Sequence, residues 1–187
     1  MRKNFNDVGV FPQPVLVIGT YDEAGVPNAM NVAWGGMCGG RHVVIHISRR
    51  HKTTDNIYAK KAFTMSFADQ AHLVEADYFG LISGTQENKI EKAGFHAVPA
   101  QFVDAPLFEE LPLTLECQVV EMTETPYGPL RIVAEVKNLS ADESLLDENG
   151  QLDTGRFQPL AYDRLRRVYC TLGDVVGNAY ADGKKLF

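Results

Sequence analysis

A chain of 187 residues with 45% hydrophobic content can bury a full core without disulfides or metal ions. Its formal net charge of -6 and its pI near 5.3 argue against nucleic acid or an anionic membrane as partner, because such binding needs clustered Lys and Arg. No second composition marks another domain, so we expect a single domain over residues 1–187.

The first predicted element is a β-hairpin over residues 14–34. A strand rich in Val and Ile is followed by the turn residues Asp22, Gly25 and Pro27, and a second strand starts near Ala29. Residues 41–48 then form a third predicted strand, because apolar side chains alternate along RHVVIHIS and give it one buried face.

Short helices and longer strands follow. TTDNIYAKKAF predicts a short helix behind hydroxyl residues suited to an N-cap, and AFTMSFA predicts a strand. LVEADYF and QENKIEK, at 73–79 and 86–92, are predicted helices, the second stopped by Gly94. Two long strands, at 113–123 and 130–139, are joined by the turn sequence ETPYGP. Beyond them we expect a solvated acidic excursion at 140–156 and a last short helix at DVVGNAY.

Five or six strands in hairpin-like succession favour a mainly β fold, an antiparallel β-barrel with peripheral helices, over a doubly wound sheet. The chain has no GxGxxG and no Walker loop. A nucleotide-like ligand would therefore need a different kind of binding site.

Residues 48–56, SRRHKTTDN, are one candidate for such a binding site. Unpaired backbone N–H groups and the positive dipole end of a helix N-terminus favour an anion, and three formal positive charges stand beside it. The alternative is that Thr53 or Thr54 only caps the helix while the basic side chains are solvated. Asp55 opposes a phosphate unless its side chain points away.

Residues 28–40, NAMNVAWGGMCGG, are the second candidate. In a strand, Asn31 and Ala33 face one side, whereas Met30, Val32 and Trp34 face the other. A flat heteroaromatic ring could lie along this edge with Trp34 packed near it. The alternative is that Trp34 plugs the barrel and the glycines form a turn.

Several segments together resemble a known family, the flavin reductase-like, FMN-binding split-barrel proteins, and within it the flavoredoxin-like group. The matching segments are PQPVLVIGTYDEAGVPNAMNVAWGG, SRRHKTTDNI, ADYFGLISG with NKIEKAG after it, DAPLFEELPLTLECQVVE and VKNLSADESLLDENG. They span roughly residues 12–150 in order. The resemblance implies a six-stranded antiparallel Greek-key FMN-binding split barrel, a homodimer with FMN at the interface, and two-electron chemistry on the flavin.

Position by position, the resemblance implies two groups of FMN contacts. The ring is expected beside Met30, Asn31, Val32, Ala33 and Trp34. The ribityl phosphate is expected beside Ser48, Arg50, Lys52, Thr53 and Thr54, with Asn56 near, and Lys89 is expected to reach the phosphate or the ring. Ala33 stands where family members often carry Ser or Thr, so one side-chain hydrogen bond is expected to be missing.

Three functional hypotheses stay open. The favoured one is an FMN-dependent oxidoreductase, either an NAD(P)H:flavin reductase or a flavoredoxin-like carrier with a redox partner protein. The second is a non-catalytic flavin-binding or sensing dimer. The third is a barrel that has lost flavin and binds another phosphorylated ligand, or serves as a dimeric interaction domain. No residues are assigned as acid, base or nucleophile.

Cysteine and histidine spacing predict neither a disulfide framework nor a metal site. Cys38, Cys117 and Cys170 are odd in number and widely spaced, which indicates a reducing compartment. His42 and His46 would lie about 13 Å apart along a strand at ~3.3 Å per residue, too far to ligate one metal. With no signal peptide and no apolar run long enough for a membrane span, we expect a cytoplasmic protein.

Overall fold

The structure is a computed structural model that describes residues 1–187. Its main sheet is built from seven strands, β2 (Leu16–Tyr21), β3 (Pro27–Val32), β4 (Gly35–Gly39), β5 (His42–Ile47), β6 (Ala62–Phe67), β9 (Leu113–Glu124) and β10 (Leu130–Ala141). They are antiparallel and lie in the order β3-β2-β6-β9-β10-β5-β4. This sheet carries the site described below.

The two ends of the sheet meet at Trp34. β3 and β4 lie at opposite ends of the strand order, yet only Ala33 and Trp34 separate them in the chain. The backbone N–H of His46 donates to the Trp34 carbonyl at 2.8 Å, where the chain leaves β2 and begins to pair with β5. β3 and β4 therefore act as one bent strand that closes a six-stranded barrel.

The strand order is a Greek key. β2, the bent β3–β4 strand and β5 are consecutive neighbours, and β6 returns to lie beside β2. The long connection before β6 contains helix α1 (Lys52–Lys60), which packs against β2 and β3. The predicted antiparallel barrel with peripheral helices is thereby confirmed.

Two apolar cores lie on the two faces of β2. Leu16 and Ile18 point into the barrel, where they join the residues of the opposite strands. Val15 and Val17 point outward and are covered by α2 (Leu73–Leu81) and α3 (Lys89–Ala93). Burying each such side chain contributes roughly 1.5–3 kcal/mol, so the period-two alternation of the sequence fixes which face each strand presents.

Several expectations need correction. The glycine run after Trp34 is a strand, β4, and not a turn, because its backbone pairs with β5. DVVGNAY forms no helix; a short 3₁₀ helix, η3 (Asp182–Leu186), follows it instead. The acidic excursion is anchored rather than fully solvated, since Leu145 of η1 (Glu143–Leu145) is buried against Leu113 and Phe157. A further 3₁₀ helix, η2 (Thr154–Arg156), precedes Phe157.

Five further short strands were not expected from the sequence. β1 (Gln13–Pro14), β11 (Leu160–Asp163) and β12 (Val168–Thr171) form a separate three-stranded sheet in the order β1-β11-β12. β7 (Ala97–Pro99) and β8 (Pro106–Phe108) form a two-stranded one. Such short strands lack the length over which alternation becomes visible, so no sequence pattern predicted them.

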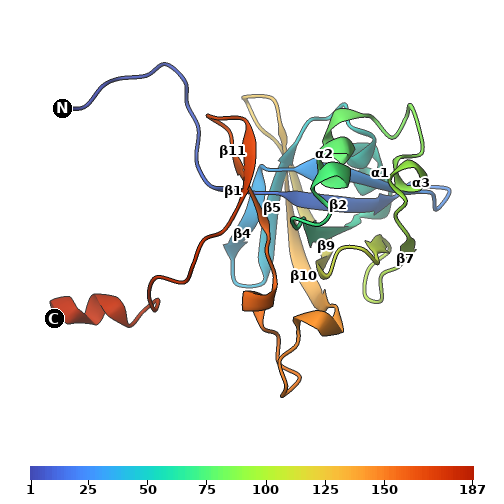
Figure 1. Ribbon diagram of the computed structural model, residues 1–187. Helices are drawn as coiled ribbons and strands as arrows, with labels where there is room; N and C mark the ends of the chain where they lie inside the picture. Colours follow the sequence, from blue (N-terminus) through green and yellow to red (C-terminus); the bar gives the residue numbers. More distant parts are fainter.

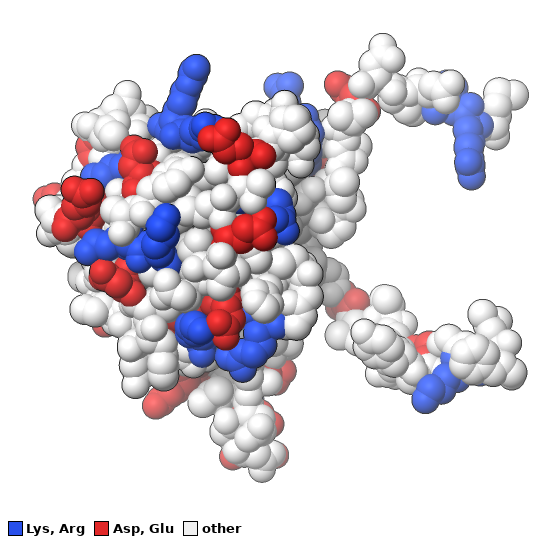
Figure 2. All heavy atoms as spheres, turned by 180° about the vertical axis from the view of Figure 1, so that it is seen from behind, with Lys and Arg blue, Asp and Glu red and all other residues white.

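Both termini project from the same side of the barrel (Figure 1). Residues 1–12 and 171–187 are exposed throughout, although they carry many large apolar side chains. On the face seen in Figure 2, acidic and basic side chains are interspersed and no large patch of one sign appears. No helix of the structure has the length and apolar character needed to span a membrane.

Candidate functional site

A wide pocket opens where β3 and β5 separate. Its volume is about 540 Å³. It is lined by Met30, Asn31, Val32, Ala33, Trp34, His46, Ile47, Ser48, His51, Gly128 and Pro129. β3 pairs with β2 and β4 pairs with β5, so the splitting of the bent strand at Trp34 creates the opening. We call this hollow the wide pocket.

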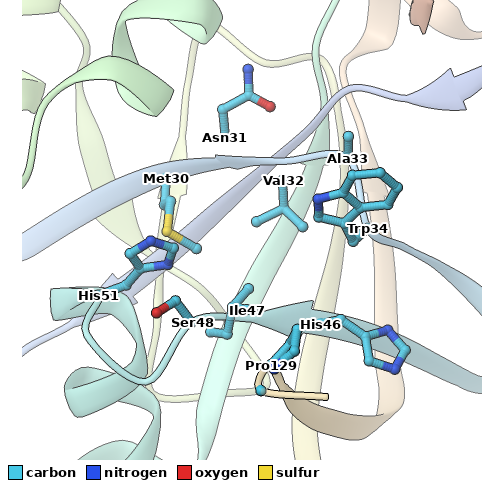
Figure 3. A pocket seen from close by; sticks show the side chains of 11 residues that line it. Met30, Asn31, Val32, Ala33, Trp34, His46, Ile47, Ser48, His51 and Pro129 are labelled. Carbon is cyan, nitrogen blue, oxygen red and sulfur yellow. The ribbon is translucent and has the colours of Figure 1, made fainter. Parts of the chain in front are cut away.

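The side chains of β3, and of Ala33 and Trp34 after it, point alternately to the two sides of the chain, as the strand pattern predicts. Met30, Val32 and Trp34 point to the side of β5, whereas Asn31 and Ala33 point to the opposite side (Figure 3). Met30 and Val32 also close the barrel core. Trp34 is 45% exposed and belongs to no core cluster, so the alternative in which it plugs the barrel is wrong.

The backbone of β3 offers unpaired hydrogen-bonding groups to the wide pocket. β3 is an end strand in the sheet order, so one of its edges has no strand partner. Edge strands present a row of free N–H and C=O groups. The Asn31 side chain cannot replace them in the pocket, because its Nδ2 donates to the Ala76 carbonyl of α2 at 2.9 Å. A planar ligand with ring carbonyls and nitrogens matches this edge.

A second, smaller hollow adjoins the first. Its volume is about 310 Å³, and Met30, Asn31 and His51 line both pockets. Its other lining residues are Asn28, Lys52, Thr53, Phe79, Gly80, Leu81, Ile82, Ser83, Gly84, Gln86 and Lys89. Two lysines and no carboxylate line it, so we call it the basic pocket.

Lys89 is the most unusual group in the basic pocket. Its side chain is buried, with 4% of the residue exposed, and its Nζ donates to the Phe79 carbonyl at 3.0 Å. No carboxylate pairs with it, and burial lowers its pKa to about 8. A buried ammonium with one neutral acceptor has two further donors available for an anion.

His51 lies between the two pockets. Burial, followed by the charge of Lys89, lowers its pKa below the usual 6.5, so the imidazole is neutral at pH 7. It is also the N-cap residue of α1, but its side chain makes no capping bond. The backbone N–H groups of Lys52 and Thr53 likewise find no partner in the protein, which leaves the positive end of the helix free.

Asn28 and Gly84 shape the basic pocket from opposite sides. The Nδ2 of Asn28 donates to Thr53 Oγ1 at 2.9 Å, which fixes the first turn of α1 against β3. A Cβ on Gly84 would overlap Asn28 Oδ1 and would lie 3.4 Å from Lys52 Cδ. Only glycine therefore lets the 82–84 segment approach the Asn28 amide so closely.

The structure brings most of the predicted site residues together. Those lining one or both pockets are Met30, Asn31, Val32, Ala33, Trp34, Ser48, Lys52, Thr53 and Lys89. Arg50, Thr54 and Asn56 line neither. Arg50 is exposed, Thr54 Oγ1 donates to the Ser48 carbonyl at 2.7 Å, and Asn56 Nδ2 donates to Thr20 Oγ1 at 3.0 Å.

Two details of the 48–56 segment differ from expectation. Thr53 and Thr54 lie inside α1 and do not act as N-cap, because the helix begins at Lys52. Asp55 points into a separate surface hollow with Asp22 and Glu23, so its charge does not face the basic pocket. Lys52 is partly neutralised by Asp22, at 3.3 Å, which leaves Lys89 as the unpaired cation.

From the sequence, no side-chain contact with a ligand was expected for Asn28, His46, Ile47, His51, Ser83, Gly84, Gln86 or Pro129, although Asn28 belongs to the second candidate stretch. Asn28 and His51 stand beside predicted contacts, and their polar side chains were the available signal. The 79–86 segment is far from both candidate stretches in the chain, so only tertiary contact places it at the pocket.

Comparisons with known proteins identify the family and the fold of the chain. The family described as flavin reductase like domain matches residues 8–173. The flavoredoxin of Desulfovibrio vulgaris (Miyazaki F) is similar at 29% identity and a TM-score of 0.91, over 98% of this chain and 100% of that one. The flavoredoxin from Methanosarcina acetivorans is 28% identical with a TM-score of 0.88, over 100% and 99%.

A more distant structure shares the fold. It is an FMN-binding protein from Thermus thermophilus with bound 1-cyclohex-2-enone, at 18% identity and a TM-score of 0.76, over 95% of this chain and 99% of that one. No curated protein matches the chain.

Proposed function

The chain belongs to the flavin reductase-like domain family, and we propose that it is an FMN-binding oxidoreductase of the flavin reductase or flavoredoxin type. The observation that carries this proposal is the buried, carboxylate-free Lys89 in a basic pocket that opens into a wider, apolar-walled one. These two adjoining pockets fit a ligand with a flat ring, which the wide pocket would hold, and a phosphorylated chain, whose phosphate the basic pocket would hold.

The residues of both pockets fit FMN. The free edge of β3 matches the polar rim of the ring, and Met30 and Val32 supply an apolar surface against its face. Lys89 and the free N–H groups of α1 match a phosphate. When bound, FMN supplies a ring that accepts a hydride or two electrons.

The chain's own residues bind and orient the cofactor rather than transfer protons. His51 is neutral at pH 7 and stands between the ring side and the phosphate side, where it can donate or accept a hydrogen bond. Trp34 lines the wide pocket, where its partly exposed indole gives the flavin ring an aromatic neighbour. The electron donor is an NAD(P)H molecule or a redox partner protein.

A spectroscopic experiment tests this function. The purified protein, or the protein after addition of FMN, should be yellow with the absorption of oxidised flavin. Anaerobic addition of NADH or NADPH should bleach it if the protein is a reductase. Bleaching only by dithionite or a partner protein would indicate a carrier or a sensor, and a protein that takes up no FMN would refute the proposal.

The exposed arms at 1–12 and 171–187 support a homodimer with FMN at the interface. Val175 and Val176 are 92% and 99% exposed, and no residue of either arm belongs to a core cluster. We expect each arm to pack on a second copy of the chain, because exposed apolar clusters of this kind mark association surfaces.

Charge placed in the C-terminal arm should weaken this dimer. We expect a variant with Val175→Asp and Val176→Asp to be monomeric in light scattering at micromolar concentrations where the wild-type chain is dimeric, and to bind FMN more weakly. Asn178→Asp is the matched control, because it adds a charge to the same arm at a polar position. A double variant that stays dimeric would contradict the role of the arm.

A further inference from the structure

A second positively charged site stands at the far end of the wide pocket. The turn between β11 and β12 has the sequence RLRR, residues 164–167, and places Arg164, Arg166 and Arg167 on the surface. All three are exposed, and none forms an ion pair. Three free arginines within four residues are unexpected in a chain whose net charge is -6. We call these residues the arginine turn.

The carboxylate that precedes the arginine turn in the chain does not neutralise it. Asp163 is buried, and its Oδ1 accepts hydrogen bonds from the backbone N–H groups of Leu165 at 2.9 Å and Arg166 at 3.1 Å. Asp163 therefore fixes the shape of the turn, and the guanidinium groups stay available. An arginine fork matches the geometry of phosphate oxygens.

Arg164 connects the turn to the wide pocket. Its guanidinium carbon lies 5.3 Å from the centroid of the Trp34 ring, a cation–π distance. Trp34 lines the wide pocket but not the basic one. The wide pocket is therefore flanked by two cationic sites, Lys89 at one end and the arginine turn at the other.

One bound FMN carries one phosphate group, which the basic pocket accommodates. A second anion site beside the ring pocket suits a reductant that brings its own phosphates to the flavin. We propose that the arginine turn binds the phosphates of a reduced pyridine dinucleotide, so that its dihydronicotinamide reaches the ring in the wide pocket. This proposal rests on the function proposed above.

The dinucleotide itself supplies the hydrogen and the electrons for the step that follows binding. The dihydronicotinamide gives one hydride, a proton with two electrons, to bound FMN and leaves as the oxidised nicotinamide. The arginines take no part in this transfer. They raise the affinity of the protein for the dinucleotide, so their loss is expected to raise KM and to leave kcat unchanged.

The test replaces the three arginines by glutamine together, Arg164→Gln, Arg166→Gln and Arg167→Gln. In anaerobic reduction of the FMN-loaded protein, KM for NADH and NADPH should rise about 2 to 100-fold, as expected for two or three lost exposed ion pairs. The uncharged donor 1-benzyl-1,4-dihydronicotinamide should react equally with both proteins. A triple variant with Lys60→Gln, Lys137→Gln and Arg156→Gln removes the same charge from ion-paired positions and should behave as wild type.

A binding measurement gives a readout independent of turnover. Trp34 is the only tryptophan, so its fluorescence should report oxidised dinucleotide binding at the arginine turn, and the signal should be lost in the triple variant. Unchanged KM and unchanged binding in that variant would overturn the proposal, as would an equal loss with the uncharged donor. If neither donor reduces the wild-type protein, the reductase form of the proposed function fails and the carrier form stays, and the fluorescence titration still decides whether the turn binds dinucleotide phosphates.

Discussion

Replacing Lys89 by methionine is expected to weaken FMN binding by about 10 to 100-fold at pH 7 and to change riboflavin binding little. A hydrogen bond to a charged group contributes roughly 1.5–3 kcal/mol, and the loss falls on the phosphate that riboflavin lacks. Fluorescence titration of the apo-protein with each flavin measures both affinities. Lys92→Met is the matched control, because Lys92 lies in the same helix but is exposed and paired with Glu87 at 2.7 Å.

The stability of the same variant separates a binding role from a structural one. Burial of the Lys89 charge destabilises the folded apo-protein below its folded pKa of about 8, and this cost disappears as pH rises toward the ordinary value of 10.5. Apo Lys89→Met should therefore unfold at pH 7 with a Tm no lower than wild type. A lower Tm accompanied by equal losses for FMN and riboflavin would show that Lys89 only supports the fold.

The pH dependence of FMN affinity follows from the same group. Above pH 8, Lys89 of the free protein loses its proton, and the dissociation constant of FMN should rise by up to about tenfold per pH unit. Lys89→Arg keeps its charge throughout this range, so its affinity should stay level between pH 8 and pH 9.5. An identical pH profile for the two proteins would assign the titration to another group.

Gly84→Ala is expected to damage the basic pocket from the other side. The new Cβ would displace the Asn28 side chain and break its hydrogen bond to Thr53 Oγ1. Overpacking costs typically 1–3 kcal/mol, and a buried donor left without a partner costs a similar amount. We expect the free energy of unfolding to fall by about 2 kcal/mol and FMN to bind about tenfold more weakly, since the first turn of α1 is no longer held against β3.

A double-mutant cycle tests whether the overlap with Asn28 causes these losses. If the overlap with Asn28 is responsible, Gly84→Ala should add little to Asn28→Ala, because the shorter side chain leaves room for the new methyl group. Gly173→Ala is the control glycine, since a Cβ there meets nothing within 4 Å. Additive losses in the double variant, measured by urea unfolding and FMN titration, would place the damage elsewhere.

Much of the barrel could be predicted from the sequence, because the alternation of apolar and polar residues along a strand can be read from a few consecutive residues. The apolar positions of β2, β5, β6, β9 and β10 recur every second residue, and burying one face of a strand is what a barrel requires. The end of α3 at Gly94 could also be predicted from neighbouring residues, because a glycine with a φ of 69° commonly ends a helix. β4 was not predicted, since three of its five residues are glycines, which give no alternation of apolar and polar side chains, and its pairing with β5 exists only in the closed sheet.

The sequence by itself determined the longer strands of the barrel, the side of the chain to which Trp34 points, and a basic segment beside a helix N-terminus. Only the tertiary structure decided which of these residues meet. It placed Trp34 at the split of the barrel, left Lys89 buried without a carboxylate, and turned Thr54 and Asn56 away from the pockets. The reason is physical: periodicity fixes the face of an element that is buried, whereas strand order and helix packing choose its neighbours.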